Sequence, residues 1–243
     1  MKRNYEAEVI RRVAFIKERI KAAGADGIVY GNSGGKDSAL VGILCKMACD
    51  NTVGLIMPCQ SKRNFGIDRD DALTVADHFK IETREVDITR LKRDACEVLA
   101  TVTELSPLAS ANINARLRMI TLYAVAASEN RLVAGTGNRS EAYVGYFTKW
   151  GDGANDFNPI ADLTVSEIYE FLKYLGCPEC VIIKAPSAAL YDGQTDESEM
   201  GISYADIDAM LLGGSVEKDI AEKIEKRHAA SEHKRVLPYT IGE

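Results

Sequence analysis

Residues 28–38 read IVYGNSGGKDS, and this stretch decides the fold. Its first three residues form a short apolar run that is typical of a buried β-strand, and the run passes directly into a turn with two consecutive glycines. Residues 37–48, which follow the turn, have the apolar spacing of a helix. The stretch therefore predicts a strand, a glycine-rich turn and a helix in immediate succession.

The same alternation continues along the rest of the chain. Further helices are expected at residues 5–23, 68–79, 91–101, 112–130 and 165–175, and further strands at residues 52–57, 82–86 and 132–135. Residues 145–158 and 185–203 are expected to be loops, and a last helix is expected to follow Ser215 as its N-cap and to reach Ala229. This order predicts an α/β fold with a single doubly wound, mainly parallel sheet and helices on both faces, which binds ligands at the carboxyl ends of its strands.

Length and composition exclude several classes of protein. The chain has 243 residues, of which 46% are hydrophobic and 27% charged, so intrinsic disorder is excluded. No stretch without a charge, such as residues 51–61, is longer than 11 residues, which is fewer than the roughly 18 that a membrane helix needs, and the amino terminus lacks the apolar segment of a secretory signal. We therefore expect a cytoplasmic protein with no membrane partner. The net charge of -6 argues against a nucleic-acid partner.

The chain also lacks signs of internal division. We find no internal repeat, and no linker rich in glycine, proline or serine separates one part from another. Residues 1–243 are therefore expected to form one domain.

The turn at residues 33–38 is a candidate phosphate site. Its backbone N–H groups and the positive end of the following helix dipole are expected to point into one concavity. Gly34 and Gly35 permit the close approach of an anion, Ser33 and Ser38 offer hydroxyl groups, and Asp37 could hold a divalent metal against the phosphates. A purely structural tight turn is the alternative interpretation.

Two familiar nucleotide-binding motifs do not fit the chain. A Walker A loop would need glycine where Tyr30 stands and a hydroxyl residue where Asp37 stands. Residues 135–140 almost match a dinucleotide fingerprint, but Ser140 replaces its third glycine. The glycine-rich turn is therefore of another type.

Five other segments accompany the turn along the chain. They are NINARLRM at residues 112–119, GTGNRSE at residues 135–141, GYFTKWGDG at residues 145–153, QTDE at residues 194–197 and HKR at residues 233–235. The turn itself resembles the SGGxDS pyrophosphate-binding loop of the ATP pyrophosphatases. Together, in this order and over nearly the whole chain, the six segments resemble those of the NAD synthetase family.

The resemblance implies an amidation that uses ATP with Mg²⁺. ATP would adenylate the nicotinate carboxylate of deamido-NAD, pyrophosphate would leave, and ammonia would displace AMP to give NAD. The family also implies a homodimer with the dinucleotide site at the subunit interface. The chain shows no glutaminase domain, so free ammonia is the expected nitrogen source.

The resemblance also implies roles for individual residues. The ATP-binding residues would be Gly31, Ser33, Gly34, Gly35, Lys36, Asp37, Ser38, Thr136 and Ser187. The deamido-NAD-binding residues would be Arg116, Lys149, Asp156, His233 and Lys234. Asp37 and Glu141 would be the metal ligands, and Asp37 and Asp152 the catalytic residues, with Asp152 holding or deprotonating the incoming ammonium. Arg118 cannot share a helix face with Arg116, so Arg116 is preferred.

The chain departs from the family pattern at two places. Val165 stands where the family usually has a lysine that contacts ATP, and Ala189 replaces a carboxylate. We hypothesise that Lys36 or Lys184 supplies the missing positive charge.

Two other functions stay open. One is a different ATP pyrophosphatase, either an adenylating amidotransferase or a sulfur-inserting tRNA enzyme, although the chain shows no convincing catalytic cysteine pair or basic extension. The other is an ATP-binding sensor without turnover.

Overall fold

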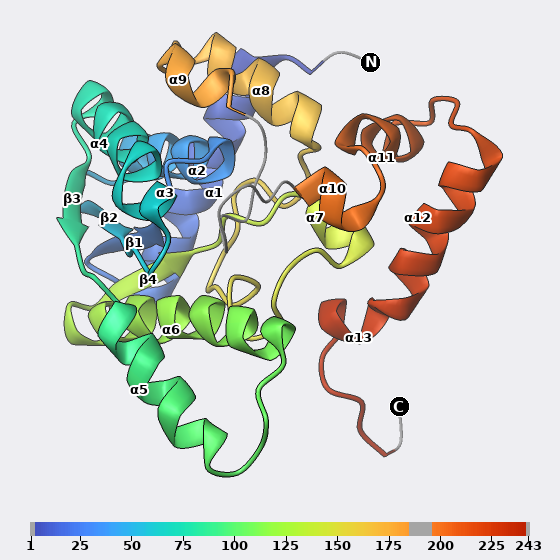
Figure 1. Ribbon diagram of the computed structural model, residues 1–243. Helices are drawn as coiled ribbons and strands as arrows, with labels where there is room; N and C mark the ends of the chain where they lie inside the picture. The colour runs from blue at the N-terminus through green and yellow to red at the C-terminus, as the bar shows by residue number, and fades with distance from the viewer. Residues whose placement is uncertain (1–2, 185–195, 242–243) are drawn as a thin grey trace.

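Parallel strands form the centre of the protein in the computed structural model, which describes residues 3–184 and 196–241 (Figure 1). Within these residues the strands are β1 (Gly27–Gly31), β2 (Thr52–Ile56), β3 (Glu82–Glu85) and β4 (Arg131–Ala134). They are all parallel and lie in the order β3-β2-β1-β4, with Val29 of β1 in register with Val53 on one side and Val133 on the other. β1 and β2 are almost entirely buried, as expected of strands covered on both faces.

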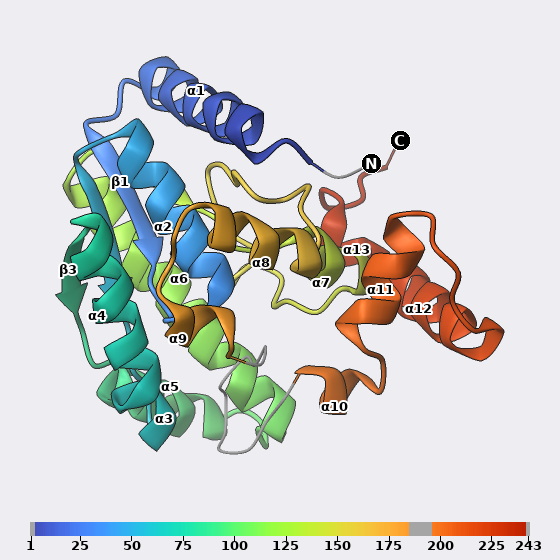
Figure 2. The ribbon, with the colours of Figure 1, turned by 90° about the horizontal axis from the view of Figure 1, so that it is seen from above.

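Helices cover both faces of this sheet (Figures 1 and 2). Their bounds are α1 (Tyr5–Ala23), α2 (Lys36–Ala48), α3 (Lys62–Phe65), α4 (Ile67–Phe79), α5 (Thr89–Ala100), α6 (Pro107–Ser128), α7 (Arg139–Val144), α8 (Val165–Tyr174), α9 (Glu179–Ile182), α10 (Asp196–Met200), α11 (Tyr204–Leu211), α12 (Lys218–Ala230) and α13 (Glu232–Arg235). Ile28 and Tyr30 of β1 pack with α1, α2, α4 and α8, whereas Val29 packs with residues of α6 on the other face. The predicted α/β fold with helices on both faces is confirmed.

A third apolar cluster lies beyond the sheet, towards the carboxyl terminus. It joins α7, α8, α10, α11 and α12 through buried side chains that include Val144, Val165, Ile207 and Ile224. Figure 1 shows α10, α11 and α12, in orange and red, as an arm beside the sheet. The arm brings the last third of the chain close to the carboxyl ends of the strands.

Most predicted elements are present, but two predictions near the carboxyl terminus are wrong. The last long helix begins at Lys218 with Glu217 at its N-cap, because the chain turns through Gly213 at a φ of 79° and Ser215 stays outside the helix. Part of the predicted loop at residues 185–203 is the short helix α10. The unexpected helices have four to eight residues, too few for a 3.6-residue apolar period to be recognised.

No helix in the described part of the chain combines the length and the apolar character needed to cross a bilayer.

Candidate functional site

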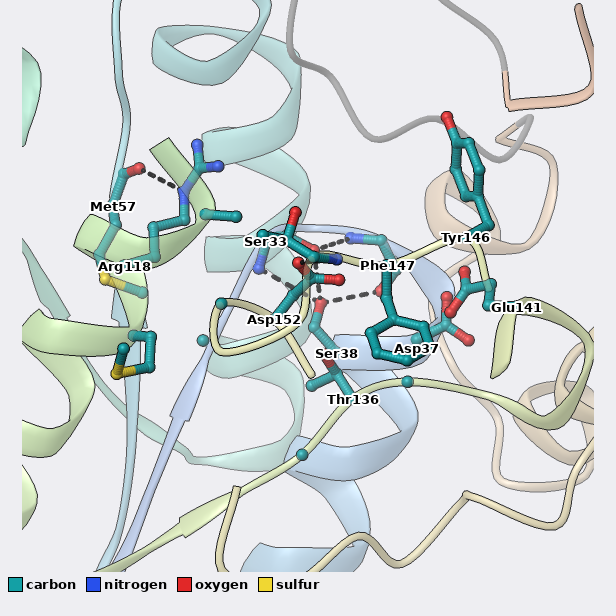
Figure 3. Close-up of a pocket in the computed structure, with 18 of the residues that line it drawn as sticks. Ser33, Asp37, Ser38, Met57, Arg118, Thr136, Glu141, Tyr146, Phe147 and Asp152 are labelled. Carbon is teal, nitrogen blue, oxygen red and sulfur yellow. Dashed lines mark hydrogen bonds between the residues drawn. The ribbon is translucent and has the colours of Figure 1, made fainter. Parts of the chain in front are cut away.

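The sheet creates a crevice beside β1. The chain builds the sheet outward from β1 through β2 to β3 and then returns to place β4 on the other side of β1. The connections after β1 and β4 therefore lead away from each other, and such a switch point leaves room for a ligand at the carboxyl edge of the sheet. A cavity of about 670 Å³ lies there, between the segments that follow β1, β2 and β4, the inner face of α6 and the segment after α7 (Figure 3).

The turn between β1 and α2 forms one end of the cavity. The hydroxyls of Ser33 and Ser38 lie 3.1 Å apart, and Ser38 Oγ donates to the carbonyl oxygen of Gly35 at 3.0 Å. Gly34 has a φ of 69°, and a Cβ there would lie 2.0 Å from the carbonyl oxygen of Asp68, so only glycine fits. The first-turn N–H groups of α2, which have no partner within the helix, complete a cradle for an anion.

Two carboxylates and a lysine lie next to this cradle. Asp37 accepts hydrogen bonds from Lys36 Nζ at 2.8 Å and from Asn138 Nδ2 at 3.0 Å. Burial and the negative charge of Asp37 raise the pKa of Glu141 to about 8. Burial alone would lower the pKa of Lys36, but the carboxylates of Asp37 and Glu141 outweigh it and raise that pKa. The two carboxylates thus repel each other at a place where a further cation would stabilise both.

This pair fits a magnesium ion that also binds phosphate. Mg²⁺ is usually held by one or two carboxylates together with phosphate oxygens and water, rather than by a complete cage of protein ligands. Asp37 and Glu141 both face the cavity, and no group of three or more potential metal-binding side chains occurs in the described part of the chain. The donor set therefore suits a metal that arrives with a nucleotide.

The segment after α7 supplies a third carboxylate, Asp152. Its side chain is accessible from the cavity, and its Oδ1 accepts the backbone N–H of Thr148 at 3.0 Å. The protein that surrounds the cavity raises the pKa of Asp152 by desolvation. Lys234 holds the same segment, because its Nζ donates to the carbonyl oxygens of Gly145 at 2.8 Å and Phe147 at 2.9 Å.

The two arginines of α6 lie in different surroundings. Arg118 lines the cavity, where its Nε donates to the carbonyl oxygen of Met57 and its Nη2 to Asn64 Oδ1, each at 3.3 Å (Figure 3). Arg116 is exposed, does not line the cavity, and donates to the carbonyl oxygen of Lys149 at 3.3 Å. The two side chains occupy separate faces of the helix, as expected from their spacing, and Arg118 is the one that faces the cavity.

The predicted site residues separate into two groups. Those that line the cavity are Gly31, Ser33, Gly35, Lys36, Asp37, Ser38, Thr136, Glu141, Asp152 and Lys234. Those that do not line it are Gly34, Arg116, Lys149, Asp156 and His233, and Ser187 lies outside the described residues. Gly34 belongs to the turn itself. Of the other four, Arg116, Asp156 and His233 are exposed, and Lys149 is half-buried.

This second group is held in place by local hydrogen bonds. Lys149 Nζ donates to the carbonyl oxygen of His233. Asp156 accepts the backbone N–H of Val133 at 2.7 Å and the hydroxyl of Tyr123 at 3.2 Å. These contacts fix the orientation of the Lys149 and Asp156 side chains.

Of the two departures from the family pattern, Val165 can be placed, whereas Ala189 lies outside the described residues. Val165 begins α8 and is buried in the third apolar cluster, so no charge stands at that position. Lys36 and Lys184 both line the cavity, and Lys184 Nζ lies 2.7 Å from carboxylate oxygens of both Asp68 and Asp71. The hypothesis that one of these lysines compensates for Val165 stays a prediction.

Several residues in or directly behind the cavity wall were not assigned a role of their own from the sequence. Asn138 caps α7 in a capping box with Glu141 and also binds Asp37, and its position directly after the fourth strand was the available signal. Asp196 is buried and accepts the hydroxyl of Tyr204 at 3.1 Å. Tyr146 and Phe147 also line the cavity, but an aromatic residue in a loop gives no signal of its own.

Comparison with known proteins identifies the family. Residues 8–238 match the NAD synthase family. An NH3-dependent NAD(+) synthetase from Carboxydothermus hydrogenoformans is 44% identical over 98% of both chains. Two solved structures are also similar. An NMN synthetase from Francisella tularensis has 37% identity and a TM-score of 0.93 over 100% of both chains. An NH3-dependent NAD synthetase from Campylobacter jejuni has 32% identity and a TM-score of 0.80 over 98% of this chain and 99% of that one.

These likenesses extend over almost the full length of the chain, and the cavity contains the glycine-rich turn, the paired carboxylates and the segment after α7 that the family resemblance singled out. Members of this family use ATP as a co-substrate. The chain belongs to the NAD synthase family and is a ligase.

Proposed function

We propose that this protein amidates the nicotinate carboxylate of deamido-NAD with ammonia, at the expense of ATP, to give NAD, AMP and pyrophosphate. The observation that carries the proposal is the placement of the glycine-rich turn, Asp37, Glu141 and Asp152 around one cavity at the switch point of the sheet. The turn suits a pyrophosphate group, and Asp152 is available for the ammonia step. We also propose that residues 1–243 act as one domain.

The first step forms an acyl-adenylate. A nicotinate oxygen attacks the α-phosphorus of ATP, the bond from that phosphorus to the bridging oxygen breaks, and pyrophosphate leaves with the bonding electrons. The backbone donors of the turn and the Ser33 and Ser38 hydroxyls bind the leaving pyrophosphate, because preorganised donors stabilise charge where it develops. Asp37 and Glu141 would hold Mg²⁺, which supplies neutralisation of phosphate charge when bound.

The second step forms the amide. Ammonia attacks the carbonyl carbon of the adenylate, the bond from that carbon to the AMP oxygen breaks, and AMP leaves. Asp152 accepts a proton from the incoming nitrogen, because ammonium has no lone pair until it loses that proton. The raised pKa of Asp152 makes its carboxylate a better base than an ordinary aspartate.

A homodimer is part of the proposal. Val98 and Leu99 of α5 and Leu108 and Ile120 of α6 are exposed apolar side chains, Ile120 to 56%, on helices that cover one face of the sheet. Burial of this surface against a second copy would remove apolar area from water. A second subunit there would also lie close to Arg116, which is exposed on the same helix.

Amidation of nicotinate mononucleotide to NMN is the second candidate function. It is favoured by the similarity to the Francisella tularensis NMN synthetase over the full length of both chains. Only a dinucleotide has a second nucleotide that could reach Arg116, Lys149, Asp156 and His233. The two candidates differ in substrate and share the chemistry.

One experiment tests both candidates. The purified protein is supplied with ATP, Mg²⁺ and ammonium chloride, together with either deamido-NAD or nicotinate mononucleotide, and kcat/KM is measured for each amide product. A higher value for deamido-NAD supports the first proposal, and a higher value for the mononucleotide supports the second. If the protein binds ATP but releases no AMP in the presence of either nicotinate nucleotide, both candidate functions are contradicted and a sensor is favoured. Parallel reactions with glutamine test the expectation of free ammonia.

A further inference from the structure

Arg118 is a charged side chain for which the reaction described above has no use. It projects from the inner face of α6 into the cavity wall, beside Met57 at the carboxyl end of β2 (Figure 3). Protein surrounds its guanidinium group closely enough that desolvation lowers the pKa of the arginine. Such an environment is costly for a charge and calls for an explanation.

The neighbours of Arg118 do not balance its charge. Both acceptors of its hydrogen bonds, the Met57 carbonyl and the Asn64 amide oxygen, are neutral, and both bonds are long at 3.3 Å. Within residues 3–184 and 196–241, no carboxylate forms an ion pair with it, and Asp152 and Asp68 favour its charged form only from a greater distance. A guanidinium group has five N–H donors, so several are left to bind a ligand.

The position of Arg118 indicates what that ligand contributes. Figure 3 shows Arg118 at one end of the cavity, the paired carboxylates Asp37 and Glu141 at the other, and Asp152 between them. The turn at residues 33–38 already supplies hydrogen-bond donors for the pyrophosphate end of ATP. An arginine at the opposite end suits a different oxygen anion, because its planar fork matches the geometry of a carboxylate or a phosphate.

We infer that Arg118 binds an oxyanion of the substrates, separate from the pyrophosphate that the glycine-rich turn receives. This inference rests on the proposed amidation, in which the oxyanion is either the carboxylate of the nicotinate nucleotide or the α-phosphate of ATP. Both share the chemistry that Arg118 recognises. In either case Arg118 helps to bring the nucleophilic carboxylate and the α-phosphorus together.

Binding measurements with Arg118→Gln test the inference and separate the two sources. The affinities for α,β-methylene-ATP and for deamido-NAD are measured separately by calorimetry in the presence of Mg²⁺. A charge-assisted hydrogen bond contributes enough for us to expect a loss of about 10- to 100-fold for one ligand. A loss for the ATP analogue alone assigns Arg118 to a phosphate, and a loss for deamido-NAD alone assigns it to the carboxylate. Arg118→Lys should show an intermediate loss because it keeps the charge but not the fork.

A matched control and a second measurement keep the test decisive. Arg19→Gln removes a half-buried arginine of α1 that does not line the cavity, and should leave both affinities unchanged. The Arg118 Nε resonance of ¹⁵N-arginine-labelled wild-type protein should shift when the recognised ligand is added, and this decides the matter if the glutamine variant does not fold. Unchanged affinities for both ligands in folded Arg118→Gln would overturn the inference. If wild-type protein binds ligand through Arg118 but makes no amide, the amidation fails and the oxyanion site stands.

Discussion

The two ends of the predicted site are built in different ways. The phosphate end consists of residues that directly follow β1 and β4, and their side chains and N–H groups converge on one cavity. The residues assigned to the far part of the dinucleotide, Arg116, Lys149, Asp156 and His233, lie outside the cavity and are exposed or half-buried, and their hydrogen bonds go to the backbone or to Tyr123. The first group is assembled by the topology of one chain, and the second lies beside the surface that the second subunit of the proposed homodimer would cover.

This difference shows what each group can do alone. Parallel strands bring their carboxyl ends to a common edge of the sheet, so the sheet topology alone brings the residues at that edge close together. Residues on a helix surface have no such constraint, and their function depends on what packs against them. We therefore expect substitutions in the first group to abolish the chemistry and those in the second to weaken substrate binding.

Asp37→Asn should have the largest effect. It removes one carboxylate of the proposed metal pair but keeps an oxygen that can accept from Asn138. We expect kcat to fall about 100- to 1,000-fold, since loss of one group that stabilises the transition state has effects of this size. Steady-state formation of AMP measures the change.

Asp50→Asn is the control for that substitution. Asp50 is fully exposed after the carboxyl end of α2, the same helix that begins at the glycine-rich turn, so its loss should leave kcat unchanged. If Asp37→Asn keeps more than half of the wild-type kcat, the phosphate end does not depend on this carboxylate.

Gly34→Ala should disrupt the phosphate end by a steric route. Alanine at a φ of 69° is strained, and its Cβ would lie 2.0 Å from the carbonyl oxygen of Asp68. We expect a decrease of about 2–5 kcal/mol in the free energy of unfolding, measured by urea titration, and weaker ATP binding.

Gly24→Ala separates the effect of backbone strain at a positive φ from the effect of a steric collision. Gly24 has a φ of 62°, but no atom lies within 4 Å of the position of a Cβ. This variant should lose only about 1 kcal/mol and bind ATP normally. Equal losses for the two variants would contradict the collision with Asp68.

The sequence was informative where structure follows from short-range chemistry. The apolar run at residues 28–30, followed by Gly34 and Gly35, predicted the strand, the turn and the helix of the phosphate end. The apolar periods of α1, α2 and α4 predicted the bounds of these helices to within one residue. Two polar residues of a later segment were instead assigned to the site through the family resemblance. Thr136 and Glu141, which follow β4, are both found there.

The sequence was less informative where long-range packing decides. Arg116 and Arg118 are two residues apart, and spacing showed that they lie on different faces of the helix, but the face that points to the cavity depends on how α6 packs on the sheet. The short helices α10, α11 and α13 are stabilised by the third apolar cluster and by contacts with α7, and their own sequences carry little periodicity. Interactions of this kind are absent from any local pattern.

Arg116→Gln tests whether the surface group belongs to the dinucleotide site. Loss of one hydrogen-bonding cation should raise KM for deamido-NAD about tenfold while KM for ATP and for nicotinate mononucleotide stays unchanged. Such a split would separate the two ends of the site functionally. An equal rise for mononucleotide and dinucleotide would contradict the assignment of Arg116 to the distal half.

Mixed dimers show which subunit supplies Arg116. If it serves the partner's cavity, a hybrid of Asp37→Asn and Arg116→Gln subunits contains one intact site and one with both defects. With deamido-NAD well below KM, where both variants alone are slow, random mixing then restores about a quarter of wild-type activity, since half of the dimers are hybrids with one active site of two. If Arg116 serves its own cavity, the mixture only averages the two variants.

Asp162→Asn should have the smallest effect and leave both ends of the site intact. Asp162 lies 2.6 Å from Arg12 Nη1, which is buried on α1, and its hydrogen bonds and ion pairs with arginines outweigh partial burial and lower its pKa to about 2. A carboxylate with a depressed pKa stabilises the folded state above its unfolded pKa of about 4, and that contribution disappears as the pH falls towards 2. Because Asp162 is half-exposed and Glu8 still pairs with Arg12, we expect the variant to lose only about 1 kcal/mol at pH 7. Urea titrations of wild type and variant between pH 7 and pH 2 should converge at the acid end, and KM for both nucleotides at pH 7 should not change. A stability difference that persists at pH 2 would show that the effect comes from packing rather than from the charge of Asp162.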